Sequence, residues 1–310
     1  MRPRRTYLAV PAHRRKMLEG AAAGAADAVF MDLEDAVPPD AKPAALSGAL
    51  AALAELDWAD KHVAVRINPV TSSQARAEVE ALRMAARLDA LIIPKTESVN
   101  DLVLLETWLN ADDAPHHIGL EPIIETAAGL VGVDAIAGAG GRLSTLHFGV
   151  GDFAASIGAR SAEIGESPAG YVQVSRQGED YASTALDLWT YPMMRLLVAA
   201  RAHGLRAIDG PCGAFRDLKL TRAWAEKAAA MGFDGKQVIH PQQIEPTRAA
   251  FTPSAGDVAF ARRVVTAMRE AQAAGLGAVQ LDGRMLDYAN LRMAERILAM
   301  AGADHHPDAD

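Results

Sequence analysis

The strongest constraint on the fold is a repeated alternation of short apolar runs with Ala-rich segments of helical character. Eight runs occur, at residues 7–11, 28–33, 62–67, 90–94, 118–124, 145–150, 206–208 and 237–239. Most of them are apolar almost throughout, which is typical of parallel strands buried on both faces. The segments between them carry helical spacing, as at Val79, Leu82 and Leu88. The pattern therefore predicts eight parallel strands separated by helices.

A charged or polar residue lies at the carboxyl end of seven of these runs. These residues are Glu34, Arg66, Lys95, Glu125, Asp152, Asp209 and His240. Most steps between them are about 30 residues long, the length of one strand–helix unit in a barrel. The step from Asp152 to Asp209 is roughly twice that length, so we expect an insertion near residues 160–190. The predicted fold class is α/β, a (β/α)8 TIM barrel.

The same seven residues predict where the chemistry lies. Each one alone could be a helix cap or part of a surface ion pair. Together they mark the carboxyl ends of the strands, the face on which barrel enzymes place their active sites. We therefore expect an active site at this rim.

The chain is about 60 residues longer than such a barrel requires. We assign residues 1–252 to the barrel and residues 253–310 to a C-terminal helical lid. A capped helix start near residue 254 predicts a helix at 257–274, followed by a turn at 280–283 and a second helix at 287–300.

Charge and cysteine content limit the partners and the compartment. The net charge of -8 argues against a nucleic-acid partner. Six basic residues nevertheless precede the first acidic one, Glu19, and form either a solvated arm or a docking point for an anionic ligand. The single cysteine, Cys212, is expected to be a buried thiol in a cytoplasmic protein. No apolar run approaches the roughly 18 residues of a membrane helix.

The acidic pair Glu125 and Asp152 is the first candidate for chemistry. Two carboxylates at the ends of neighbouring strands can hold Mg²⁺, or Mn²⁺ in its place, together with substrate oxygens. Arg66 could then bind a substrate carboxylate or stabilise a developing enolate. The alternative is a purely structural Glu–Arg–Asp network, and the spacing alone leaves both open.

Two other features suggest different chemistry. Lys95 could form a Schiff base, but an ion pair with Glu34 or Glu125 is the favoured interpretation. Residues 149–154, GVGDFA, fit the glycine pattern of dinucleotide-binding folds. No second strand ending in an acidic residue follows at the required distance, so we expect these glycines to let the backbone approach a ligand closely.

Seven segments resemble the HpcH/HpaI aldolase/citrate lyase β-subunit superfamily. They are residues 31–37, MDLEDAV; 65–68, VRIN; 92–95, IIPK; 122–129, PIIETAAG; 151–156, GDFAAS; 208–211, IDGP; and 239–241, IHP. They occur in order across nearly the whole chain. Within the superfamily the chain is most similar to the malyl-CoA, β-methylmalyl-CoA and citramalyl-CoA lyases.

The resemblance implies roles for residues at the rim. Glu125 and Asp152 would bind Mg²⁺, and Arg66 would contact the keto-acid or hydroxy-acid part of the substrate. Gly151 would lie beside the bound substrate.

Further roles follow from the same resemblance. Glu34, Asp35 and Lys95 would surround the metal site and hold its waters and the nearby cations. Residues 283–287, GRMLD, are similar to a G-R-x-x-D segment of the family, so Asp287 would act as acid or base in the site of an adjacent subunit.

Coenzyme A would contact three residues by this resemblance: Arg14 on the first loop, and Ile239 and His240 at the end of the last strand. Related lyases also place a basic residue of the first helix against coenzyme A. This chain has Gly20 at that position, so a neighbouring basic residue would have to replace it.

The implied activity is carbon–carbon cleavage, or formation, of a 3-hydroxy-dicarboxyl-CoA thioester to an acyl-CoA and a 2-oxo acid such as glyoxylate or pyruvate. The implied assembly is a homotrimer or homohexamer. One alternative is a malyl-CoA thioesterase on the same scaffold. Others are a citrate lyase β-subunit-like component that acts on a carrier-bound thioester, and an aldolase that does not use coenzyme A.

Overall fold

The fold is given by a computed structural model in which residues 3–110, 117–161 and 163–301 are described. The chain divides into two compact units. One spans Arg4–Arg248, and the other contains the C-terminal residues from Ala249 onward. Each unit is described by itself below.

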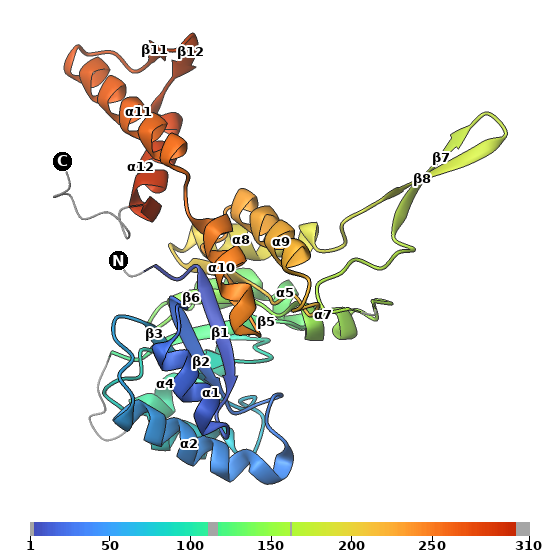
Figure 1. The fold of residues 1–310 in the computed structure, drawn as a ribbon, viewed down its shortest axis with the longest axis vertical. Helices are drawn as coiled ribbons and strands as arrows, with labels where there is room; N and C mark the ends of the chain where they lie inside the picture. The colour runs from blue at the N-terminus through green and yellow to red at the C-terminus, as the bar shows by residue number, and fades with distance from the viewer. Residues whose placement is uncertain (1–2, 111–116, 162, 302–310) are drawn as a thin grey trace. The chain divides into compact units, whose positions relative to one another are not determined.

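Eight parallel strands close into a barrel in the larger unit (Figure 1). They are β1 (Thr6–Pro11), β2 (Ala28–Asp32), β3 (His62–Arg66), β4 (Ala90–Ile93), β5 (Gly119–Ile124), β6 (Thr145–Phe148), β9 (Arg206–Asp209) and β10 (Gly235–Val238). Strands β1 to β6 pair in chain order, β6 pairs with β9, and β10 closes the barrel against β1. Each run predicted from the sequence forms one of these strands, so the predicted (β/α)8 fold is confirmed.

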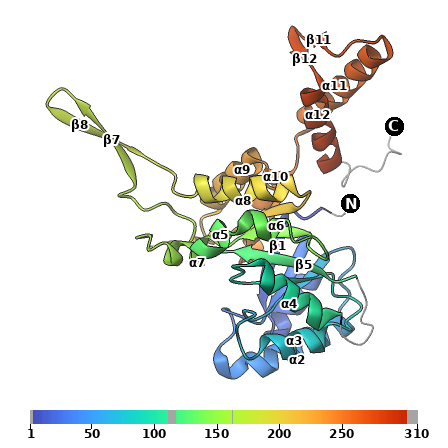
Figure 2. The same ribbon diagram turned by 180° about the vertical axis from the view of Figure 1, so that it is seen from behind.

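Helices follow the strands and lie on the outside of the barrel (Figures 1 and 2). They are α1 (Arg15–Ala23), α2 (Lys42–Glu55), α3 (Ala75–Leu82), α4 (Val99–Leu109), α5 (Ala127–Val131), α6 (Val133–Ala137), α7 (Val150–Ser156), α8 (Thr190–Ala202), α9 (Leu218–Met231) and α10 (Ile244–Phe251). Side-chain caps fix several starts; Asp217, for example, accepts a hydrogen bond from the backbone of Leu220 at the start of α9. Among the described residues, no helix combines the length and apolar character needed to cross a membrane.

The interior of the barrel is apolar in its middle and charged at both ends. The apolar cluster contains Tyr7, Ala28, Phe30, Ala64, Ala90, Ile92, Ile123 and Ile208. At the amino ends of the strands lies a buried polar cluster around Glu121 on β5. Its carboxylate contacts Arg4 Nη1 at 2.8 Å, His62 Nε2 at 3.0 Å and His147 Nε2 at 3.1 Å. We call this the amino-end cluster.

The amino-end cluster also changes the interpretation of the basic N-terminal residues. Arg4 pairs with Glu121 inside the barrel, and Arg5 pairs with Asp27 at 2.8 Å. Both arginines therefore stabilise the start of β1. They are neither part of a solvated arm nor available to an anionic ligand.

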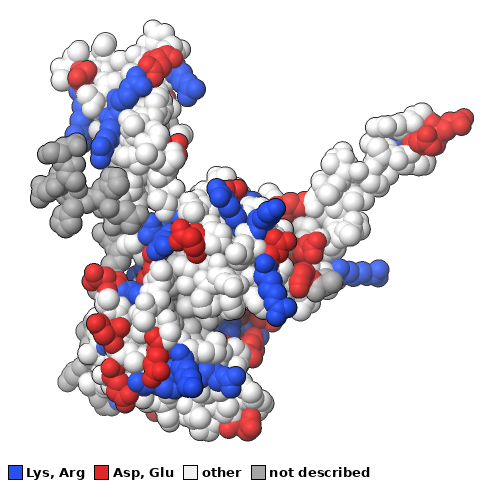
Figure 3. All heavy atoms as spheres, in the orientation of Figure 1, with Lys and Arg blue, Asp and Glu red and all other residues white. Residues whose placement is uncertain are grey.

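The insertion expected at 160–190 contains an antiparallel hairpin of β7 (Val172–Gln177) and β8 (Asp180–Ala185). Nearly every residue of both strands is exposed. Figure 3 shows acidic side chains at the tip of the hairpin and little charge along its length. The sequence predicted the insertion but not these strands, because they lack the continuous apolar character of the barrel strands.

The C-terminal unit consists of α11 (Ala255–Ala273), β11 (Val279–Leu281), β12 (Arg284–Leu286) and α12 (Tyr288–Ala301). The two helices share an apolar core that includes Met268 and Leu286. The turn expected at 280–283 is a two-residue hairpin turn, in which Asp282 and Gly283 both have positive φ. An Asp-Gly pair is a known signal for this turn, and our sequence analysis missed it.

Candidate active site

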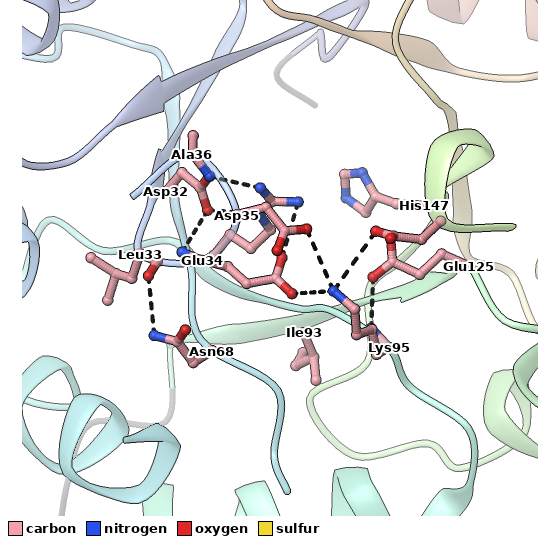
Figure 4. A network of polar contacts seen from close by, with 12 residues as sticks. Asp32, Leu33, Glu34, Asp35, Ala36, Asn68, Ile93, Lys95, Glu125 and His147 are labelled. Atoms are coloured by element: carbon pink, nitrogen blue, oxygen red, sulfur yellow. Dashed lines mark hydrogen bonds and ion pairs between the residues drawn. The ribbon is translucent and has the colours of Figure 1, made fainter. Parts of the chain in front are cut away.

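Five of the seven predicted rim residues meet at the carboxyl ends of β2 to β6. Lys95 lies at their centre: its ammonium contacts Glu34, and its backbone N–H donates to Glu125. Arg66 also contacts Glu34. Asp152, in the first turn of α7, lies 3.7 Å from Lys95 Nζ. Figure 4 shows Glu34, Lys95 and Glu125 turned toward one another. The rim thus brings together groups that are far apart in the sequence.

Arg66 is held by Asp32, a residue that the sequence analysis did not single out. The two residues are opposite each other in the β2–β3 register, and Arg66 Nε and Nη2 each donate to the Asp32 carboxylate at 2.7 Å. Burial opposes charge on both groups, but their pairing lowers the pKa of Asp32 and raises that of Arg66. Asp32 therefore fixes one edge of the guanidinium and leaves Nη1 directed to other partners.

Lys95 forms an ion pair, as the favoured interpretation expected. Its ammonium donates to Glu34 and lies 3.4 Å from Asp35. Although burial favours the neutral amine, the hydrogen bond and charge of Glu34, with Glu125 and Asp152, raise the pKa of Lys95. A Schiff base requires a neutral amine, so this environment does not favour one.

Glu125 follows β5, and its carboxyl group has a strongly raised pKa. Its side chain is 2% exposed. Burial, with the nearby carboxylates of Asp152 and Glu34, raises the pKa of Glu125 to about 8. The hydrogen bond from the Lys95 backbone only partly offsets this effect. A buried carboxyl group among like charges is strongly stabilised by a nearby cation.

Gly149 creates the space that Glu125 occupies. A Cβ atom at Gly149 would lie 2.3 Å from Glu125 Oε2 and 2.4 Å from its Cβ. We expected this glycine to admit a ligand, but the close approach is made by the Glu125 side chain itself. The packing of Glu125 therefore accounts for Gly149, the first glycine of the pattern at 149–154, without a dinucleotide.

The donor set at the rim fits a hard divalent cation. Five carboxyl groups, those of Asp32, Glu34, Asp35, Glu125 and Asp152, lie around the cationic side chains of Arg66 and Lys95. This excess of negative charge lies next to oxygen donors, the ligand type that Mg²⁺ and Mn²⁺ prefer. No group of three or more His, Cys, Asp or Glu ligands occurs among the described residues. One or two carboxylates completed by substrate oxygens and water are typical of Mg²⁺.

The proposed coenzyme A residues lie on two neighbouring loops, because β1 and β10 pair. Arg14 precedes α1 and is exposed, and its guanidinium makes no hydrogen bond or ion pair with any described residue. Ile239 is 39% exposed. The ring of His240 stacks on Phe215 with the ring centroids 5.0 Å apart, and Arg216 Cζ also lies over the Phe215 ring, 5.3 Å from its centroid.

Asp209 does not join the rim cluster. Its carboxylate pairs with the ammonium of the buried Lys236 at 2.5 Å, and the same ammonium donates to the carbonyl of Gly210. Ile208 contributes to the barrel interior, so its neighbour Asp209 faces the surrounding helices, because side chains alternate along a strand. Asp209 therefore forms a structural ion pair, which was the alternative to an active-site role for each of the seven residues.

Asp287 lies in the C-terminal unit at the start of α12. Its Oδ1 accepts hydrogen bonds from the backbone N–H groups of Ala289 at 2.8 Å and Asn290 at 3.3 Å. Asp287 therefore caps the helix within its own unit. The side chain is exposed, so a cap does not prevent it from meeting another molecule.

Two further residues help to build the site, and the sequence carried a signal for one of them. Asp32 is the last residue of β2 and is buried, within a segment of three acidic residues in four positions. A charge inside an otherwise apolar run is a sign of a paired group. Phe215 lies in a loop between β9 and α9, where no periodicity places it.

Comparisons with known proteins show which family the chain resembles. The sequence profile of the HpcH/HpaI aldolase/citrate lyase family matches residues 5–241. The chain is 38% identical to the L-malyl-CoA/β-methylmalyl-CoA lyase of Cereibacter sphaeroides, over 97% of this chain and 95% of that protein. It is 34% identical to the (3S)-malyl-CoA thioesterase of the same species, over 97% and 95%.

A solved structure is similar over almost the whole length. The CitE protein of Mycobacterium tuberculosis, in complex with magnesium, acetoacetate and coenzyme A, has a TM-score of 0.73 and 31% identity. The alignment covers 96% of this chain and 98% of that one. From the profile match and these similarities, the chain belongs to the HpcH/HpaI aldolase/citrate lyase family.

Proposed function

We propose that this protein is a Mg²⁺-dependent carbon–carbon lyase that cleaves, or forms, a 3-hydroxy-dicarboxyl-CoA thioester such as malyl-CoA, β-methylmalyl-CoA or citramalyl-CoA. The observation that carries the proposal is the buried Glu125 with its raised pKa, beside Asp152 and opposite Arg66 and Lys95. The relatives named above include a lyase of this kind, and the similar CitE structure contains magnesium and coenzyme A.

In this proposal Glu125 and Asp152 hold the ion, and Mn²⁺ can take its place. The bound ion supplies Lewis-acid stabilisation of negative charge on substrate oxygens. Arg66 Nη1, which lies 3.2 Å from Glu34 Oε2 and is not used by Asp32, binds the 2-oxo acid and offsets the charge that develops on its oxygen. Glu34, Asp35 and Lys95 keep this edge of the site charged and ordered.

Proton transfer is assigned to Asp287 of the partner subunit. In condensation its carboxylate takes a proton from the carbon next to the thioester carbonyl, and the resulting enolate attacks the carbonyl carbon of the 2-oxo acid. In cleavage a base, such as water, takes the hydroxyl proton as the carbon–carbon bond breaks, and Asp287, protonated before the step, gives its proton to the carbon of the departing acyl-CoA enolate. This assignment makes the active unit an oligomer, for which we propose a homotrimer or homohexamer in the cytoplasm, with residues 253–310 acting as the lid.

The rim above α1 is the proposed binding surface for coenzyme A. Arg14 offers an exposed and unengaged positive charge to its phosphates, and Ile239 and His240 lie on the adjacent loop. Gly151 directly precedes Asp152, and we assign it to the edge of the substrate site.

A direct assay of products tests the proposal. The protein is incubated with Mg²⁺ and malyl-CoA, β-methylmalyl-CoA or citramalyl-CoA, and carbonyl products are trapped. We expect glyoxylate or pyruvate together with acyl-CoA, and we expect EDTA to abolish their formation. Full activity in EDTA would exclude the metal role.

The same assay tests the alternatives. The similarity to a malyl-CoA thioesterase favours hydrolysis as the second candidate. A thioesterase releases free coenzyme A and malate, with no glyoxylate. A component that acts on a carrier-bound thioester leaves all free CoA esters unchanged.

A further inference from the structure

A short loop packs against the start of α7, next to the proposed metal ligand Asp152. A Cβ atom built on Gly151 would lie 3.6 Å from Cγ2, 3.7 Å from Cγ1 and 3.8 Å from Cδ1 of Ile164. These are ordinary van der Waals distances, so the whole end of the Ile164 side chain covers the open face of Gly151.

The backbone that carries Ile164 is held in place. Its carbonyl accepts a hydrogen bond from Gly213 N at 3.0 Å, in the loop that follows β9. Ser161 Oγ donates to the carbonyls of Glu163 and Glu166 at 2.8 and 2.7 Å, which closes the loop on itself. These hydrogen bonds hold the backbone of Ile164 beside Gly151.

Gly165 adds a second restraint. It has a φ of +95°, and a Cβ atom there would lie 2.5 Å from the ring of Trp224. Only glycine fits this position without a shift of the ring or the backbone. The loop is thus clamped on both sides of Ile164, against the β9–α9 loop and against α9.

Ile164 is nevertheless 46% exposed. A large apolar side chain at the edge of a charged site, on a backbone held by hydrogen bonds and half open to solvent, has a surface available to a substrate. Gly151 directly precedes Asp152, so the group nearest to Ile164 would be the part of the substrate that lies closest to the metal-bound oxygens.

We propose that Ile164 limits the size of the substituent on the 2-oxo acid that this site accepts. The inference rests on the proposed function, because it assumes that Asp152 and Glu125 hold an ion that binds the 2-oxo acid. It makes Ile164 a specificity residue, which discriminates hydrogen, methyl and ethyl substituents by contact and takes no part in proton transfer.

Binding of the 2-oxo acids tests this assignment without any turnover. Calorimetry in the presence of Mg²⁺ gives dissociation constants for glyoxylate, pyruvate and 2-oxobutyrate with the full-length protein. In Ile164→Ala we expect the affinity for 2-oxobutyrate relative to glyoxylate to rise about tenfold, and in Ile164→Phe we expect the affinity for pyruvate relative to glyoxylate to fall about tenfold. Pocket contacts of one methylene typically produce differences of this size.

Ile157 provides a matched control, because it is an isoleucine of similar exposure, 41%, at the other end of α7. Ile157→Ala should leave all three relative affinities unchanged. Unchanged ratios in both Ile164 variants, or an equal change in Ile157→Ala, would overturn the proposal. So would a wild-type protein that binds none of the three acids with Mg²⁺.

The cleavage assay then separates this inference from the proposed function. We expect Ile164→Phe to lower kcat/KM for citramalyl-CoA relative to malyl-CoA, while β-methylmalyl-CoA, whose methyl group is on the acyl side, keeps its ratio. A change in kcat/KM confined to β-methylmalyl-CoA would place Ile164 beside the acyl part of the substrate and would contradict the proposal. A protein that binds 2-oxo acids with the expected ratios but cleaves no thioester would contradict the lyase and leave the assignment of Ile164 standing.

Discussion

Strand β5 carries two buried glutamates whose surroundings have opposite electrostatic character. Glu121, at the amino end of the barrel, is fully buried, and Glu125, at the carboxyl end, is 2% exposed. Burial alone would raise both pKa values. His62, His147 and Arg4 instead hold the pKa of Glu121 well below its usual value, whereas Asp152 and Glu34 help to raise that of Glu125 to about 8.

The difference shows how one strand can serve both stability and function. The charge of Glu121 is balanced by partners within the chain, so that end of the barrel is complete. The charge of Glu125 is not balanced in the same way, because carboxyl groups outnumber cations around it. An added cation would complete this second end, which is the arrangement expected where a fold sacrifices some stability for a binding site.

The largest expected effect comes from Glu125→Gln. Because the variant removes a proposed ligand and its charge, we expect kcat/KM to fall roughly 10³-fold, about 4 kcal/mol of transition-state stabilisation, and Mg²⁺ affinity to fall with it. Initial rates against Mg²⁺ concentration measure both. Glu80→Gln, an exposed change on α3, should have no effect. Normal turnover in Glu125→Gln would mean that the two glutamates do not differ in function.

Glu121→Gln should act on stability instead. The change leaves His62, His147 and Arg4 buried without their anion, and breaking a buried charged network typically costs about 3 kcal/mol. Urea unfolding gives the loss in free energy, and activity per folded molecule should stay within about twofold of the wild type. A stable but inactive Glu121→Gln protein would contradict the division of roles between the two ends.

The pH dependence of stability should have opposite signs at the two glutamates. In metal-free protein the folded state keeps the Glu125 proton up to about pH 8, whereas an unfolded chain loses it near its ordinary pKa of 4.5. The contribution of the Glu125 proton to the free energy of unfolding is therefore present in full at low pH and is lost as the pH rises toward 8. The lowered pKa of Glu121 gives the reverse, a contribution present above the ordinary pKa and lost as the pH falls.

Urea titrations at pH 5.5 and 8.5 in EDTA measure the Glu125 part of this effect. We expect the unfolding free energy of the wild type, relative to Glu125→Gln, to decrease by about 1–3 kcal/mol between these values. Excess Mg²⁺ should remove the decrease, because the ion favours the ionised carboxylate. An increase with pH, or no dependence in EDTA, would show that Glu125 is already ionised without metal.

The two ends also differ in how far the sequence predicted them. The carboxyl end was predictable because its charged residues directly follow apolar strands at regular spacing, as Glu34, Lys95 and Glu125 do. The barrel topology then places such residues at the same end of the barrel, independently of the loop conformations. The amino-end cluster was not predicted, since Glu121 and His147 lie within strands and their partners come from distant positions.

Other parts of the structure could not be read from the sequence for physical reasons. Asp209 follows a strand as its counterparts do, but strand alternation turns it toward Lys236 and away from the rim. Ile164 lies in an irregular loop whose position depends on a hydrogen bond that Gly213 N donates to its carbonyl. The side-chain direction at the last residue of a strand and a tertiary contact of a loop both leave no periodic pattern in the sequence, so neither could be predicted from it.

The smallest expected effect separates two arginines from the same basic N-terminal segment. Arg4→Ala should destabilise the protein, because Glu121 loses a partner at 2.8 Å inside the barrel. Arg14→Ala should leave the unfolding free energy unchanged, since no described residue pairs with its guanidinium. It should instead raise KM for CoA thioesters about fivefold, or about 1 kcal/mol, by removing one phosphate contact. Added salt should reduce that difference, while the affinity for free 2-oxo acids stays constant. If Arg14→Ala weakens 2-oxo acid binding as strongly as thioester binding, its charge acts on the metal site and not on coenzyme A.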